Sequence, residues 1–315
     1  MPADSRALEA RCPKRFINGI ASFMGPANWS GDTAHWNTPT GPLRAEWSKL
    51  DAIAIGGRRV RGVIDIAQQV LVRSPEEAKA MVERHNRQPS LGLASVLPGP
   101  PAVVEMTSRA CLYDNDQRVK ESLDMILLTA AMCHVAISRE YAGTQPANRL
   151  PTHDEPCHWR PAELIELKSA MEELGDVVSL SDHTLVAKFS SMGDRLPGGA
   201  DSTGAQLALS GSHRHSVMGA GLAVELCVSI SPGREAANAL VSHLNQLEMN
   251  RWIGPPLFGA WCTDPKGRHL VFGSFFPNLA WSPDFLPRIA SWSEERLALV
   301  KNELEQVKSL SKSCS

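Results

Sequence analysis

The sequence contains an internal duplication, which limits the possible folds more than any other feature. Residues 91–110 align without a gap with residues 258–277, and each half closes with a helical pattern, over residues 117–138 and 284–309. The matched positions are Ser74/Ser231, Pro75/Pro232, Asn86/Asn245, Gly92/Gly259, Pro98/Pro265 and Val104/Val271. We therefore expect one small structural unit to occur twice in the chain.

The duplication sets the expected domain organisation. Glycine and proline recur at short intervals in residues 1–44, which predicts an irregular N-terminal arm. Residues 45–142 are expected to form a first, degenerate repeat and residues 161–315 a second, fuller one. The proline-rich residues 143–160 are expected to link them. The sequence leaves open whether the two repeats pack on each other.

The second repeat has the clearer pattern of helices and strands. Helical periodicity and strand-like alternation follow one another in the order α-β-β-β-α-β-β-α. The expected segments are residues 161–174, 183–190, 205–210, 222–229, 234–249, 258–263, 269–276 and the C-terminal helix. Strands that occur in runs are typical of α+β domains. We therefore predict two tandem α+β repeats, each a mostly antiparallel sheet packed by helices, and not a doubly wound nucleotide-binding fold.

Composition excludes several classes of protein. The 315 residues carry a formal net charge of −2 with both signs interspersed, which gives no electrostatic footprint for nucleic acid. No apolar run is long enough to span a membrane, and the polar N-terminus does not resemble a signal peptide. The seven cysteines are scattered, as in proteins with reduced thiols. We expect a cytoplasmic protein that binds neither nucleic acid nor membranes.

Three short stretches of the second repeat resemble a known family. They are residues 244–248 (LNQLE), 259–262 (GAWC) and 275–278 (FFPN). Together with the order of elements, they resemble the type III secretion chaperone-like fold, also found in YbjN-like proteins, and most of all its actinobacterial tandem relatives. The likeness covers residues 161–310 well and residues 45–142 weakly. It implies a non-enzymatic, chaperone-like module that binds a protein partner, in some cases as a homodimer, without cofactor or catalytic residue.

Aromatic residues concentrate near the C-terminal hairpin and suggest where a partner would bind. Neighbouring residues of a strand point to opposite faces, so some of these side chains must leave the core. Aromatic residues are also frequent anchors of protein interfaces. The candidate partner-binding residues are Trp252, Trp261, Phe276 and Asn278. The alternative interpretation of these aromatic residues is simple core packing together with contact between the repeats.

An alternative hypothesis is a metal- or thiol-dependent enzyme. Histidine and cysteine are common ligands of zinc and other transition metals. The candidate ligands are His153, Cys157, His158, His213 and His215, and Cys157 or Cys262 could act as a thiol nucleophile. The spacing of these residues matches no standard zinc site, and a polar linker with exposed histidines explains them as well.

Overall fold

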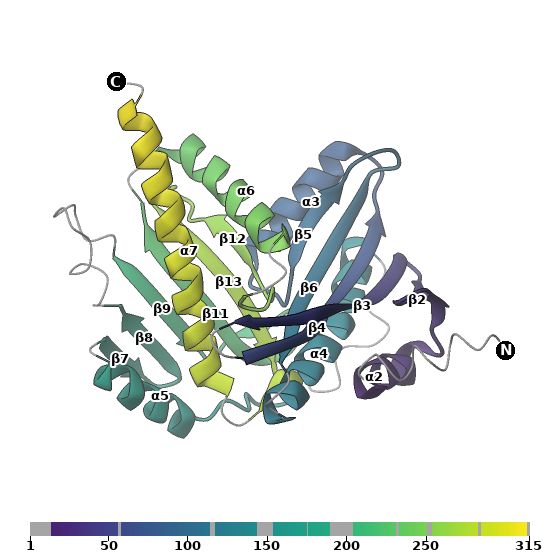
Figure 1. Ribbon diagram of the computed structural model, residues 1–315, viewed down its shortest axis with the longest axis horizontal. Coiled ribbons are helices and arrows are strands. Elements are labelled where there is room, and N and C mark those ends of the chain that lie inside the picture. Colours follow the sequence, from purple (N-terminus) through teal and green to yellow (C-terminus); the bar gives the residue numbers. More distant parts are fainter. Residues whose placement is uncertain are drawn as a thin grey trace.

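The predicted α+β class is confirmed by a computed structural model, which contains two antiparallel sheets and the helices that pack on them (Figure 1). The structure describes residues 14–55, 58–113, 117–143, 154–174, 176–189, 204–230, 233–250, 254–282 and 285–313. Each sheet belongs to one half of the chain. The halves lie side by side, with helices α3 and α6 at the same edge of the molecule.

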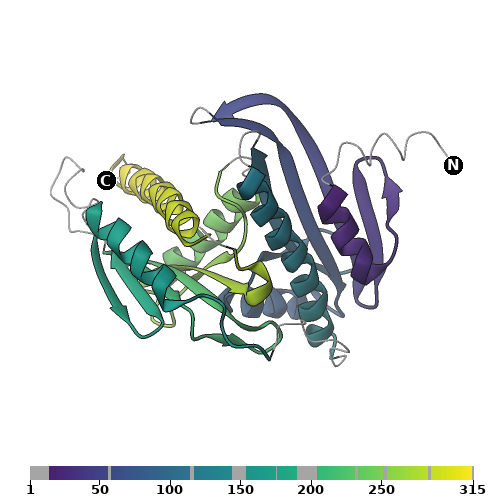
Figure 2. The same ribbon diagram turned by 90° about the horizontal axis from the view of Figure 1, so that it is seen from below.

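The described residues of the first half form three helices and six strands. Its helices are α2 (Lys14–Met24), α3 (Pro75–Arg87) and α4 (Gln117–Tyr141). Its strands are β1 (Asn28–Ser30), β2 (Thr33–Thr38), β3 (Gly41–Ile55), β4 (Arg58–Leu71), β5 (Leu93–Leu97) and β6 (Val103–Tyr113). Helix α2, purple in Figure 2, packs against α4.

The second half repeats this order. Its helices are α5 (Pro161–Glu173), α6 (Arg234–Asn250), the short 3-10 helix η2 (Asn278–Ala280) and α7 (Phe285–Ser313). Its strands are β7 (Val177–Ser181), β8 (Thr184–Lys188), β9 (Ala205–Ser210), β10 (Arg214–His215), β11 (Gly219–Ser229), β12 (Ala260–Thr263) and β13 (His269–Pro277). Apart from β10, each strand has a counterpart in the first half.

The two sheets have the same strand order, which agrees with the expected duplication. The sheets run β1-β2-β3-β4-β6-β5 and β7-β8-β9-β11-β13-β12. One row of paired residues crosses the four inner strands of each sheet, and every member of it is buried. The two rows are Ala34, Ala45, Ile66 and Ser108 in the first sheet, and Leu185, Leu209, Val224 and Ser274 in the second.

The prediction of an irregular N-terminal arm is wrong for residues 14–44, and residues 1–13 of that arm lie outside the described residues. Residues 14–44 form α2, β1, β2 and the start of β3, so these elements belong to the first repeat. Gly31 and Gly41 have positive φ, +60° and +146°, and lie at the turns between these strands. The glycines therefore mark tight turns in a sheet rather than loss of structure.

Two further expectations need correction. The expected order of the second repeat lacks the two-residue β10 and β7, a short edge strand that ends at Ser181, just before the turn residue Asp182, whose φ is +47°. The gap-free alignment also fails within the last hairpin, where the structure requires a shift of one residue. Met106 pairs with Ala94, twelve positions before it, whereas Phe272 pairs with Trp261, eleven positions before it. The register thus makes Arg109 the counterpart of Phe275, not of Phe276.

An asparagine closes the edge of each sheet in the same way. The side-chain amide of Asn86 donates to the carbonyl of Ala94 (3.0 Å) and accepts from its amide (2.9 Å). Asn245 makes the same pair of bonds with Trp261, at 3.0 and 2.9 Å. Each asparagine thus takes the place of a neighbouring strand at one residue of an edge, which is a way to protect an edge from further pairing.

The two repeats pack on each other through reciprocal contacts. The amide of Phe275 in β13 donates to the carbonyl of Ser90 (3.2 Å), just before β5. In return, Leu257, just before β12, exchanges two backbone bonds with Arg109 in β6, at 2.8 and 3.3 Å. Ser90 and Leu257 are counterparts, as are Arg109 and Phe275. Each repeat thus offers the other equivalent positions, as in an isologous interface, although one bridge is parallel and the other antiparallel.

Most of the buried apolar side chains of both repeats form one continuous core, from Phe16 in α2 to Val300 in α7, and Leu93, Leu257 and Ala260 form a small second cluster to which both repeats contribute. Hydrophobic burial is the main favourable term in folding, so a shared core ties the stability of one repeat to the presence of the other. The two repeats are therefore one packed body.

The duplicated glycines provide a test of this fold. A Cβ atom at Gly92 would lie 2.7 Å from the carbonyl oxygen of Thr107, and one at Gly259 would lie 2.4 Å from that of Gly273. We expect Gly92→Ala and Gly259→Ala each to lower the free energy of unfolding by about 1–3 kcal/mol in urea denaturation. Gly233→Ala is the control, because a Cβ there meets nothing within 4 Å. Equal stability of all three variants would contradict the close approach.

Candidate functional site

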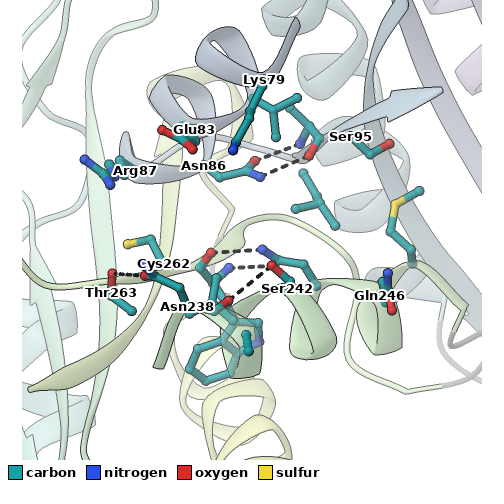
Figure 3. A pocket seen from close by; sticks show the side chains of 18 residues that line it. Lys79, Glu83, Asn86, Arg87, Ser95, Asn238, Ser242, Gln246, Cys262 and Thr263 are labelled. Carbon is teal, nitrogen blue, oxygen red and sulfur yellow. Dashed lines mark hydrogen bonds between the residues drawn. The ribbon is translucent and has the colours of Figure 1, made fainter. Parts of the chain in front are cut away.

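The candidate site is a groove where the two repeats meet (Figure 3). Its volume is about 520 Å³, within the range of roughly 300–1,000 Å³ found for ligand sites. Helix α3 and strand β5 form one side, and their counterparts α6 and β12 form the other. The equivalent pairs that line it are Lys79/Asn238, Val82/Val241, Glu83/Ser242, Asn86/Asn245, Arg87/Gln246, Ala94/Trp261 and Ser95/Cys262.

The sequence of α3 explains why this helix forms and which of its faces lines the groove. The helix starts at Ser74, whose hydroxyl accepts from the amide of Glu77 (3.2 Å), and Pro75 follows at the first helical position. Ala78, Met81 and His85 form its buried face. Because helical neighbours recur every three to four residues, the face that carries Lys79, Glu83 and Arg87 points away from the core.

Helix α6 repeats this arrangement with different side chains. Its buried face consists of Ala237, Leu240, Leu244 and Glu248, which leaves Asn238, Ser242 and Gln246 toward the groove. Figure 3 shows these three opposite the charged residues of α3. One wall is therefore charged and the other polar but neutral. The remaining lining is more apolar and consists of Val82, Leu93, Val241, Met249 and the thiol of Cys262, which together we call the floor of the groove.

The thiols of Cys262, Cys227 and Cys157 are not activated as nucleophiles. Burial raises the pKa of Cys262 to about 11, although the positive charge of Arg87 acts in the opposite direction. Burial also raises the pKa of Cys227 to about 11 and increases that of Cys157. The thiolate is the nucleophilic form of cysteine, and these groups are protonated at neutral pH. The environment of these cysteines therefore does not favour the thiol-enzyme alternative.

The candidate metal ligands are not gathered into one site. His153 lies outside the described residues. Nδ1 of His215 accepts from the amides of Val217 (3.1 Å) and Met218 (3.3 Å). His158 pairs with Glu155 at 3.0 Å, and the rings of His213 and His215 flank Phe275. Over the described part of the chain, no three His, Cys, Asp or Glu side chains are placed to hold a metal ion.

Three of the four expected partner-binding residues are buried. Trp261 is 0% exposed, and Phe276 and Asn278 are each 3% exposed; Trp252 lies outside the described residues. Strand β13 lies between β12 and β11, and the ring of Phe276 packs edge-on against Phe285 of α7, 5.0 Å between centroids. Elements of the same chain thus cover Trp261, Phe276 and Asn278, so none of these three side chains presents an exposed aromatic or amide group on the surface.

These interior residues have structural partners instead. Asn278 donates to the carbonyl of Pro156 (2.7 Å) and accepts from the amide of His158 (3.0 Å), which fixes the segment before α5. Near Trp261, Arg296 of α7 donates to the carboxylate of Glu248 in α6 (2.9 Å), and both side chains are buried. Removing one member of such a pair is strongly destabilising.

Sequence reasoning missed a buried polar network beside the seam between the repeats. Nε2 of His85 lies 3.1 Å from the hydroxyl of Ser90, and its Nδ1 lies 3.3 Å from that of Tyr141. Nε2 of His134, in α4, lies 2.8 Å from the hydroxyl of Ser108. The sequence contained one signal for this network. His85 falls on the apolar stripe of α3 with Ala78 and Met81, which indicates a buried histidine.

This network predicts loss of stability in acid. Burial lowers the pKa of His85 to about 4, with a further contribution from His215, and lowers that of His134 to about 3. The unfolded histidines titrate near 6.5, so the unfolded chain binds more protons as the pH falls below that value. We expect the free energy of unfolding to drop by roughly 2 kcal/mol per histidine between about pH 7 and pH 4.5.

Urea unfolding at both pH values measures this effect. In His85→Gln and His134→Gln, the decrease between the two pH values should be smaller than in the original chain, whatever the stability of the variants at neutral pH. If the free energy of unfolding falls by as much in both variants as in the original chain, these histidines do not titrate as their burial requires.

Comparison with known proteins leaves the family open: no family model matches the chain, and no curated protein or solved structure matches it. Within the described residues, no helix combines the length and the apolar character that a membrane crossing needs.

Proposed function

We propose that the chain is a non-catalytic protein-binding module that takes a segment of a partner protein into the groove between its repeats. The observation that carries the proposal is the groove itself, lined by the same faces of α3 and α6. Neither repeat has this site alone. It joins an apolar floor to polar and charged walls, which is the usual composition of a recognition site.

The proposed family is the type III secretion chaperone-like group. Apart from the two-residue β10 and the short helix η2 of the second repeat, the order α-β-β-β-β-α-β-β-α is common to both repeats and supports this proposal. We also propose a cytoplasmic location. The free thiols of Cys111, Cys133, Cys157, Cys227 and Cys262 support it, because reduced cysteines are typical of that compartment.

Filling the groove tests the proposed function. Ala239 is exposed and lines the groove, so Ala239→Trp places a bulky ring there without touching the core. We expect this variant to retain less than a tenth of the partner that the original chain captures from a lysate of its own cells, quantified by mass spectrometry. Ala236→Trp is the matched control, because Ala236 is exposed on the same helix but does not line the groove.

Both variants should unfold at the same temperature as the original chain, since the two positions are exposed. The proposal fails if Ala239→Trp captures the same proteins in the same amounts as Ala236→Trp, or if the original chain captures none.

A further inference from the structure

Three charged side chains of α3 stand in a row along the groove. Lys79, Glu83 and Arg87 are four residues apart, so they follow one another on one face of the helix, about 6 Å per step. All three are exposed, and none of their side chains forms an ion pair or hydrogen bond with another described residue. The wall thus presents a positive, a negative and a positive charge that the described chain leaves unpaired.

We infer that the segment bound in the groove is an amphipathic helix of a partner protein whose rim carries an acidic, a basic and an acidic residue at four-residue spacing. This inference rests on the proposed function and names the chemistry of the partner. A helix lying along α3 has the same rise per residue, so its charges stay in step with Lys79, Glu83 and Arg87. Because the pattern is the same from both ends, either direction of the partner helix satisfies it.

The floor of the groove suits the apolar face of such a helix. Val82 of α3 and Val241 of α6 are counterparts, and with Leu93 and Met249 they supply the apolar side chains of the floor. Helix-in-groove recognition uses apolar anchors at spacings of three and four residues with a polar rim. Methionine adapts its shape to different apolar partners, which helps such a floor accept a helix.

The edge asparagines favour a helix over an extended strand. A strand added to a sheet binds through main-chain hydrogen bonds to the free edge. In the groove, the side chains of Asn86 and Asn245 already form hydrogen bonds with the outward-facing N–H and C=O groups of Ala94 and Trp261. An inserted strand would lose those bonds, whereas a helix satisfies its own backbone groups internally.

The charge pattern argues against a second copy of this chain as the occupant. If two copies of the chain paired through α3 about a two-fold axis, Glu83 would lie opposite Glu83 of the other copy. Lys79 would lie opposite Lys79 or Arg87 of the other copy. Like charges placed opposite each other are unfavourable and exclude a wrong partner. The neutral wall formed by Asn238, Ser242 and Gln246 offers no charges that change this result.

The test is a selection with a displayed library of amphipathic helical peptides whose rim positions vary among Glu, Lys and Ala. We expect the full chain to enrich peptides with an acid-base-acid rim at least tenfold over those with a base-acid-base rim. The triple variant Lys79→Glu, Glu83→Lys, Arg87→Glu should enrich the opposite pattern. These side chains are exposed and unpaired, so the variant keeps the fold, which its unfolding temperature checks.

The inference is overturned if the chain and its triple variant enrich the same peptides, if extended peptides without helical pattern are selected, or if no peptide is enriched. The proposed function is judged separately, by lysate capture with Ala239→Trp. Partner capture that Ala239→Trp abolishes but the triple variant leaves unchanged would keep the groove as the binding site and reject the charge pattern.

Discussion

In each repeat, the residue just before the edge strand β5 or β12 connects that repeat to the other one. Ser90 accepts a bond from the amide of Phe275, and its counterpart Leu257 exchanges bonds with Arg109. Arg109 also places its guanidinium between the carboxylate of Asp65 in its own repeat and the carbonyl of Met249 at the end of α6. Because the contacting positions are counterparts, one unit written twice supplies both sides of its own interface, as in a dimer of identical chains.

This pairing creates the groove and decides what it can bind. It sets α3 and α6 along one edge of the molecule, where their solvent-facing sides become opposite walls. The asparagines that close the two sheet edges are equivalent, whereas the outward residues of the helices have diverged. One helix carries charges and the other neutral polar groups. A duplicated unit thus keeps its structural hydrogen bonds and varies the side chains that face a partner.

Much of the fold could be predicted because some residues are fixed by backbone contacts. Gly92 and Gly259 match in the sequence because each faces a strand carbonyl too closely for a side chain. The N-terminal strands were missed because Gly31 and Gly41 serve as turns, which a sequence pattern does not separate from loops. The aromatic hairpin was assigned to a partner surface because alternation shows two faces but not that α7 covers one of them. The charges of Lys79, Glu83 and Arg87 gain a role only when α6 lies opposite.

The central claim is that the two repeats form one body through their reciprocal contacts, and cutting the connection between them tests it most directly. A specific protease site inserted between residues 144 and 150 would allow the folded protein to be cleaved there. The reciprocal contacts and the shared core predict that both fragments elute together as one complex and unfold in a single transition. Elution as two separate, folded fragments would contradict the claim, and the groove would then have no fixed walls.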